Sequence, residues 1–262
     1  MDYETLTFEI KHGVAHLTLN RPKNANALNL KMAEELRAVS IRCAEDRAIR
    51  SVLLTGNGKA FSGGGDLESF AQAGDQLPVL LKEITTHLHA AISTFSRMSA
   101  PLVIAVNGVA AGAGMPLAFS GDFVLAAQSA KFTSAYTKIG LSPDGSSTFI
   151  LPRLIGLRKT KELLLLNRLL TAQEALDWGL VNQVWPDAEL LPKAEEMAKE
   201  LAHGPTRSFG AVKVLLIDSL SENLETQMAK EARLIGAMGH TKDAKEGIHA
   251  FLEKRPAKFT GI

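Results

Sequence analysis

The sequence predicts an α/β protein with a mostly parallel β-sheet, followed by a helical C-terminal region. Three observations carry this prediction. Residues 5–10 and 14–19 alternate apolar and polar side chains, which is typical of half-buried strands. Between residues 30 and 127, short apolar runs alternate with segments of helical periodicity, as in β–α–β units. After residue 145, helical patterns dominate.

The first elements form a predicted hairpin and a helix. Lys11, His12 and Gly13 separate the two alternating segments and predict a turn between paired strands. Pro22 follows the second strand and cannot donate to a strand ladder. From Leu30 to Cys43 the apolar side chains recur at helical spacing.

The middle of the chain alternates strands with glycine-rich loops and helices. Apolar runs predict buried strands over residues 51–55, 101–106 and 123–127. A helix is expected over residues 79–95, where the apolar side chains are spaced by three and four. The segment 108–120 is expected to be a glycine-rich loop that turns into a helix.

The C-terminal part is predicted to hold four or five helices and one short apolar segment, residues 180–185. We expect an α/β core over residues 1–200 and a helical region over residues 201–262. No linker rich in Ser, Gly or Pro separates them.

Composition narrows the possible functions. Lys and Arg total 29 and Asp and Glu total 28, so the near-neutral balance argues against a nucleic-acid partner. Cys43 is the single cysteine, which excludes an internal disulfide and a multi-cysteine metal site. No apolar run approaches the ~20 residues that span a bilayer. The first residues lack the basic and apolar regions of a secretory signal, so we expect a cytoplasmic protein without a membrane partner.

Common catalytic and nucleotide-binding motifs are absent. The segment 55–60 fails the phosphate-loop pattern, and both glycine clusters fail GxGxxG. GxSxG and HExxH do not occur. His87 and His89 are two residues apart, which places them on different sides of a helix, so no metal site is expected.

Two glycine-rich segments remain, FSGGGDL (61–67) and GVAAGAGMP (108–116). Each follows an apolar strand and leads toward a helix. Backbone N–H groups from two such loops can converge on one point and stabilise an oxyanion. Tight turns and close packing also explain such clusters, so the residues alone leave both interpretations open.

Several segments, spread from end to end, give the chain a resemblance to the enoyl-CoA hydratase/isomerase (crotonase) family. They are LNRPKNANALN (19–29), VLLTGNGKAFSGGGDL (52–67), APLVIAVNGVAAGAGMPLAFSGDFVLAA (100–127), AKFTSAYTKIGLSPDGSSTFILPRLIG (130–156), LTAQEALDWGLVNQVW (170–185) and AFLEKRPAKFTG (250–261). The resemblance implies a spiral of β–β–α units with a helical C-terminal trimerisation region. It also implies an acyl-CoA thioester substrate and a homotrimer or hexamer, with no separate cofactor because coenzyme A is part of the substrate.

The resemblance assigns site residues. The amides of Gly65 and Ala113 are expected to hold the thioester oxygen. Phe251 and Lys254 are expected to reach the CoA of a neighbouring subunit, although a core anchor and a solvated helix end are their alternative interpretations. Further substrate contacts are implied at Ala25, Ala27, Ala60, Ser62, Gly63, Gly64, Asp66, Leu67 and Gly112. The depth of the acyl pocket is expected to depend on residues 68–95.

The chain departs from the hydratases of this family at two positions. Their two glutamates correspond to Pro116 and Tyr136 here, and neither residue supplies a carboxylate. Asp144 remains, in GLSPDGSST, where isomerases of the family use one acid. A single carboxylate can remove a proton from C2 of the acyl group and return it at C4. The alternative interpretation of Asp144 is a helix N-cap.

Two other functions stay open. The 4-chlorobenzoyl-CoA dehalogenases of this family also place an Asp at the position of Asp144, a His at that of His89, and a Trp at that of Tyr136. We expect His89 and Tyr136 to shape the acyl site, and an ordinary helix histidine is the alternative for His89. A catalytically silent relative that binds CoA or RNA is the third possibility.

Overall fold

The alternating N-terminal segments pair as predicted. In the computed structural model, which describes residues 3–262, β1 (Leu6–Lys11) and β2 (Val14–Leu19) form an antiparallel hairpin. His12 and Gly13 adopt φ values of 51° and 81°. A two-residue hairpin turn with positive φ at both positions follows the right-handed twist of the strands.

This hairpin begins a six-stranded sheet with the order β1-β2-β3-β5-β7-β10. From β2 onward every neighbouring pair is parallel, which confirms the predicted mostly parallel sheet. The central strands are almost fully buried because helices cover both faces of the sheet. The strands are β3 (Ser51–Gly56), β5 (Leu102–Val106), β7 (Phe123–Ala127) and β10 (Gln183–Trp185).

A second sheet of four very short strands has the order β4-β6-β8-β9. The sequence prediction treated residues 61–67 and 108–120 as loops and a helix, and this was wrong for two of the strands. Strands of two or three residues are too short to show alternation. They are β4 (Ala60–Ser62), β6 (Val109–Ala111), β8 (Lys131–Thr133) and β9 (Leu170–Thr171).

The chain alternates between the two sheets. β3, β5 and β7 of the large sheet are each followed by a strand of the small sheet and then by a helical segment. This repeat is the predicted spiral of β–β–α units. The first helical segments are α1 (Leu30–Glu45), α2 (Leu67–Ala73), α3 (Leu77–Arg97) and α4 (Gly114–Phe119), with 3₁₀ turns η1 (Pro22–Asn24), η2 (Gly74–Gln76) and η3 (Tyr136–Ile139).

Six helices follow between residues 147 and 252, where four or five were predicted. The extra element is α6, a six-residue helix that begins at a capping box of Thr171 and Glu174, and it is too short to show a helical period. The helices are α5 (Ser147–Leu166), α6 (Ala172–Asp177), α7 (Asp187–Ala202), α8 (Thr206–Asp218), α9 (Leu224–Gly239) and α10 (Lys242–Leu252).

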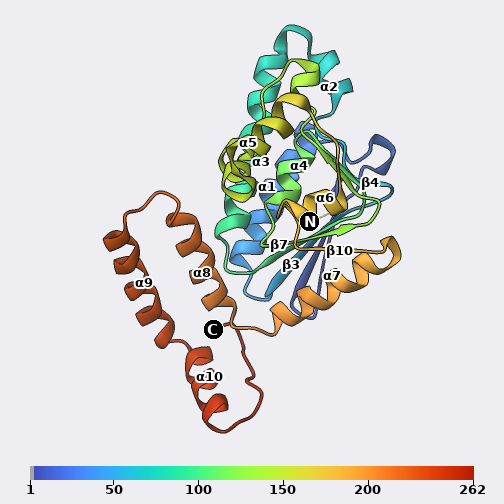
Figure 1. Cartoon of the computed structure of the whole chain (residues 1–262). Coiled ribbons are helices and arrows are strands. Elements are labelled where there is room, and N and C mark those ends of the chain that lie inside the picture. The colour runs from blue at the N-terminus through green and yellow to red at the C-terminus, as the bar shows by residue number, and fades with distance from the viewer. Residues whose placement is uncertain (1–2) are drawn as a thin grey trace.

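The last three helices lie beside the α/β core rather than around it (Figure 1). They expose large apolar side chains to solvent. The boundary at residue 200 between the α/β core and the helical region stays a prediction. The exposed side chains are Val212, Leu216, Leu224, Met228, Ile235, Ile248, Phe251 and Leu252.

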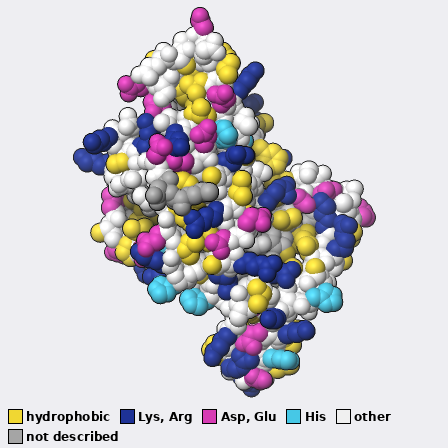
Figure 2. Space-filling view, turned by 180° about the vertical axis from the view of Figure 1, so that it is seen from behind, with side chains coloured by type: hydrophobic (Ala, Val, Ile, Leu, Met, Phe, Trp, Pro, Cys, Tyr) yellow, Lys and Arg dark blue, Asp and Glu magenta, His cyan; other side chains and the backbone are white. Residues whose placement is uncertain are grey.

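Cys43 lies on the buried face of α1, and burial raises the pKa of its thiol to about 12. The thiol is therefore protonated and unreactive at neutral pH. On the face shown in Figure 2, acidic and basic side chains are interspersed. Among residues 3–262, no helix combines the length and the apolar character needed to cross a bilayer.

Candidate active site

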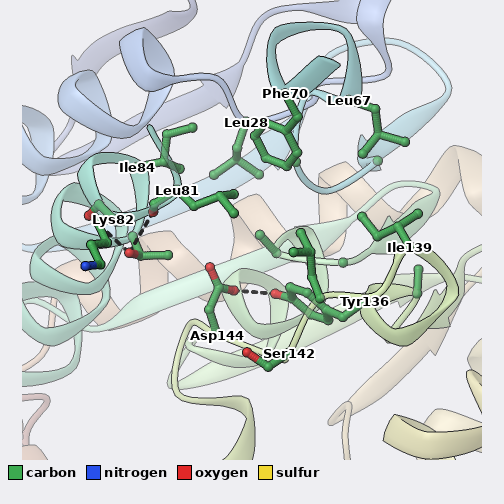
Figure 3. Close-up of a pocket in the computed structure, with 17 residues that line it drawn as sticks. Leu28, Leu67, Phe70, Leu81, Lys82, Ile84, Tyr136, Ile139, Ser142 and Asp144 are labelled. Carbon is green, nitrogen blue, oxygen red and sulfur yellow. Dashed lines mark hydrogen bonds between the residues drawn. The ribbon is translucent and has the colours of Figure 1, made fainter. Parts of the chain in front are cut away.

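Three loops meet at one edge of the small sheet. β4, β6 and β8 are parallel neighbours, so their carboxyl ends lie at the same edge. The loops that leave these ends carry Gly63 and Gly65, Gly112 and Ala113, and Tyr136. Together they form one side of a cavity of about 260 Å³ (Figure 3).

The two glycine-rich loops touch because Gly64 has no side chain. Its φ of +97° is rarely adopted by other residues. A Cβ atom on Gly64 would lie 2.8 Å from the Ala111 carbonyl oxygen and 3.1 Å from Gly112 Cα. Glycine at position 64 therefore permits the close approach that brings the second loop to the cavity.

The amides of Gly65 and Ala113 are free to bind a ligand. Leu28 donates to the Gly64 carbonyl (2.7 Å) and accepts from the Asp66 N–H (3.0 Å), so the Gly65 N–H points away from Leu28. Within residues 3–262, neither the Gly65 N–H nor the Ala113 N–H has a protein acceptor. Both residues line the cavity. Two such donors can stabilise an oxygen that becomes anionic during a reaction.

Asp144 supplies the one carboxylate among the residues that line the cavity. Its Oδ1 accepts a hydrogen bond from the Tyr136 hydroxyl (Figure 3). The N-cap residue of α5 is Ser146, and the Asp144 carboxylate caps no helix. The geometry therefore favours a role at the cavity over the N-cap interpretation.

Burial raises the pKa of Asp144 above its usual value. The hydrogen bond from Tyr136 acts in the opposite direction, and burial outweighs it. Burial also raises the pKa of Tyr136, and the neighbouring Asp144 carboxylate adds to this effect. Tyr136 is therefore a hydrogen-bond donor, while Asp144 is suited to accept and release a proton.

The remaining wall is largely apolar, and the sequence analysis did not assign its residues individually. As expected, the segment 68–95 contributes to it. On α3, Leu81 and Ile84 continue the buried stripe that includes Leu88, so helical spacing was the available signal. The unassigned lining residues are Leu28, Phe70, Leu81, Lys82, Ile84, Thr85, Ala135, Ile139, Leu141 and Ser142.

Of the residues predicted to contact substrate, Gly63, Leu67, Gly112 and Tyr136 line the cavity. Others support the loops. The buried Ser62 hydroxyl donates to the Asn26 carbonyl (2.9 Å) and accepts from the Gly64 N–H (3.2 Å).

Asp66 also supports the first loop. It caps α2 and pairs with Arg21 at 2.8 Å. The Ala25 carbonyl accepts from the Gly63 N–H at 2.8 Å. Ala27, Ala60 and Gly64 belong to the same loop region and do not line the cavity.

Three further predicted residues, outside the loop region, also do not line the cavity. His89 on α3 accepts a hydrogen bond at Nε2 from the Gly145 N–H, at 3.0 Å. Phe251 lies near the end of α10 and is 84% exposed, and Lys254 follows that helix. α10 lies at the opposite end of the molecule from α2, so neither residue can reach the cavity of its own chain (Figure 1).

No group of three or more His, Cys, Asp or Glu side chains is placed to hold a metal ion in the described part, residues 3–262. The cavity instead combines two free amides, one carboxylate with a raised pKa and an apolar wall. This set can hold a polarised carbonyl and move a proton on a neighbouring carbon.

Known proteins are similar to this chain in sequence and fold. The enoyl-CoA hydratase/isomerase family model matches residues 9–261. A probable enoyl-CoA hydratase of Rhodobacter capsulatus is 42% identical over the full length of both chains. The 1,2-epoxyphenylacetyl-CoA isomerase of Escherichia coli is 37% identical, covering 98% of this chain and 99% of its own.

The structure also matches solved structures. An enoyl-CoA hydratase from Polaromonas sp. JS666 superposes with a TM-score of 0.92 and 32% identity, covering 97% of this chain and 99% of its own. The family expected from the sequence is thereby confirmed, and the fold is the crotonase fold. The chain belongs to the enoyl-CoA hydratase/isomerase family of acyl-CoA enzymes.

Proposed function

We propose that this enzyme is an enoyl-CoA isomerase that moves a carbon–carbon double bond from the 3,4 to the 2,3 position. The observation that carries the proposal is the single carboxylate, Asp144, in a cavity that also holds two free amides. The amides of Gly65 and Ala113 bind the thioester oxygen. They stabilise the enolate that forms when C2 loses a proton.

In this reaction Asp144 acts twice. Its carboxylate removes a proton from C2, and the electrons of the C2–H bond delocalise over the thioester and the former 3,4 double bond. The protonated Asp144 then delivers the same proton to C4. The product is the 2-enoyl thioester, and no water is consumed or released. The apolar wall supports these two proton transfers because it limits the access of water to the enolate.

Hydration has less support from the site. Addition of water to a double bond needs groups that orient, deprotonate and reprotonate the water. The positions that carry glutamates in hydratases hold Pro116 and Tyr136, and Tyr136 donates its hydroxyl hydrogen to Asp144. Hydratase activity is therefore expected to be low.

Dehalogenation also has less support. In that chemistry the Asp at the position of Asp144 attacks an aromatic ring as a nucleophile, and the dehalogenases also place a His at the position of His89. The Nε2 lone pair of His89 is already occupied by the Gly145 N–H. A catalytically silent binder is disfavoured because the carboxylate and both amides line an open cavity.

The test is the conversion of 3-enoyl-CoA into the conjugated 2-enoyl-CoA, followed by ultraviolet absorbance with short, long and aromatic acyl chains. We expect conversion by the wild type and a fall of at least about 1000-fold in Asp144→Asn, since it removes the only carboxylate among the residues that line the cavity. Asp177→Asn, a carboxylate outside the cavity, is the matched control. Absence of conversion with every chain would overturn the proposal, and chloride release from 4-chlorobenzoyl-CoA would then be measured.

We also propose a homotrimer, or a pair of trimers, in the cytoplasm. The exposed apolar side chains of α8, α9 and α10 support an interface with other copies of the chain. Phe251 and Lys254 can contact CoA only if they belong to a neighbouring subunit, because they lie far from the cavity of their own chain. Light scattering after gel filtration tests this, and a monomer at micromolar concentration would contradict it.

A further inference from the structure

Tyr136 lies in the loop that follows β8. Its hydroxyl donates a hydrogen bond to one carboxylate oxygen of Asp144. Its ring is buried, with 7% of the residue exposed. Its N–H donates to the Ser134 carbonyl at 2.8 Å, and its carbonyl accepts from the Leu141 N–H at 3.1 Å. The ring and the backbone of Tyr136 are thus both held, so its hydroxyl meets Oδ1 of Asp144 from a defined direction (Figure 3).

His89 holds the peptide that follows Asp144. An amide N–H can only donate, so the Nε2 atom that it contacts at 3.0 Å must carry a lone pair. His89 is therefore neutral in this arrangement, with its proton on Nδ1. On the other side of this peptide, a Cβ atom on Gly145 would lie 2.8 Å from Pro116 Cγ, so Gly145 sits tightly against α4.

The carbonyl of Asp144 is held as well. The N–H and the hydroxyl of Ser147 donate to it at 3.0 Å and 2.7 Å. The backbone of Asp144 is thus anchored at its own carbonyl and at the next N–H, and its side chain is anchored at Oδ1. No other residue among residues 3–262 donates a hydrogen bond to Oδ2, and this oxygen turns toward the Leu81 side of the cavity (Figure 3).

We propose that Tyr136 and His89 are positioning residues that hold Asp144 from two sides and leave Oδ2 as the only atom that carries the proton. This inference rests on the proposed isomerase function. The proton leaves C2 for Oδ2, and the same O–H bond breaks when the proton is returned to C4. The Tyr136 hydroxyl keeps its own proton throughout, because its pKa is raised by burial.

The first variant is Tyr136→Phe, which removes one hydroxyl and keeps the buried ring. A hydrogen bond to a carboxylate stabilises the charged form, so its loss raises the pKa of Asp144 further. We expect kcat to fall about 10- to 100-fold, with KM changed by less than about twofold. The acidic limb of the kcat/KM profile should move to higher pH by about one pH unit. His89 and Lys82, the other ionisable groups beside this carboxylate or its cavity, are retained.

The second pair of variants separates hydrogen bonding from packing at His89. His89→Gln keeps an acceptor for the Gly145 N–H, whereas His89→Leu removes it. We expect kcat to fall about 10-fold in His89→Leu and to recover to within about threefold of the wild type in His89→Gln. Equal losses in both variants, or no loss in either, would overturn the role of His89.

A titration of Asp144 tests the same inference without turnover. Carboxyl ¹³C NMR of protein labelled at Asp follows each carboxyl group, and the signal missing from Asp144→Asn identifies Asp144. We expect its midpoint to rise in Tyr136→Phe. An unchanged midpoint and unchanged kinetics would overturn the inference. If the wild type fails to isomerise any 3-enoyl-CoA, the isomerase proposal fails. A raised titration midpoint of Asp144 in Tyr136→Phe would then still support the contact between Tyr136 and Asp144.

Discussion

The attachment of α8 to the α/β core depends on Lys213, which is 8% exposed. Its Nζ atom lies 2.7 Å from Asp122 Oδ2 and donates to the carbonyl oxygens of Phe95 (2.9 Å) and Ala100 (3.2 Å). Lys213→Met keeps a side chain of similar length and removes the charge and all three polar contacts. Asp122 is then left with the Leu102 N–H as its remaining protein partner, at 2.7 Å.

Removing one partner of a buried ion pair costs about 3–5 kcal/mol, because the other charge stays buried and unpaired. The Asp122 side chain keeps 25% of its surface exposed, so water partly replaces the lost ammonium group. We therefore expect Lys213→Met to lower the free energy of unfolding by about 3 kcal/mol. Urea denaturation followed by circular dichroism measures this quantity.

The double variant Lys213→Met with Asp122→Asn is the matched control. It removes the unpaired charge, so the two changes together should cost less than the sum of the single changes. A loss below about 1 kcal/mol in Lys213→Met would refute the reasoning, since an exposed ion pair contributes that little. Strict additivity in the double variant would also refute it.

Three further predictions concern proton transfer, loop packing and the N-terminal strand. Because burial raises the pKa of Asp144 and the base must be ionised, kcat/KM should fall as the pH drops through a midpoint above 3.8, which a pH–rate profile measures. Gly64→Ala places a Cβ 2.8 Å from the Ala111 carbonyl at positive φ, so displacement of the Gly65 amide should lower kcat by about 100-fold in the isomerase assay; an unchanged kcat would contradict this packing. Burial alone would raise the pKa of Glu35, but hydrogen bonds from Thr5 and from the Glu4 N–H outweigh it and hold the pKa below 4.5. Glu35 therefore stabilises the fold above pH 4.5, and this contribution is lost as the pH falls through the lowered pKa. The stability difference between the wild type and Glu35→Gln should shrink in urea titrations below that pH, and a difference independent of pH would contradict the assignment.

The larger elements could be predicted because their patterns are long enough to read. Alternation over residues 5–10 and 14–19 and helical spacing in α1 and α3 repeat often enough to define a buried face. The glycine-rich loops could be singled out by their composition, and Asp144 by the resemblance to isomerases of the family. The strands β4, β6 and β8 could not, since three residues carry no periodicity.

By itself the sequence determined the α/β class, the two glycine-rich loops and the presence of a single acid where hydratases have two. Only the tertiary structure decided what these residues contact. Tyr136 and Asp144 are eight residues apart, and His89 and Gly145 are 56 apart, yet each pair is joined by a hydrogen bond. Such contacts depend on how β8, α3 and α4 pack around the loop before α5. Local propensity does not encode that packing, because it arises from the burial of apolar surface over the whole chain.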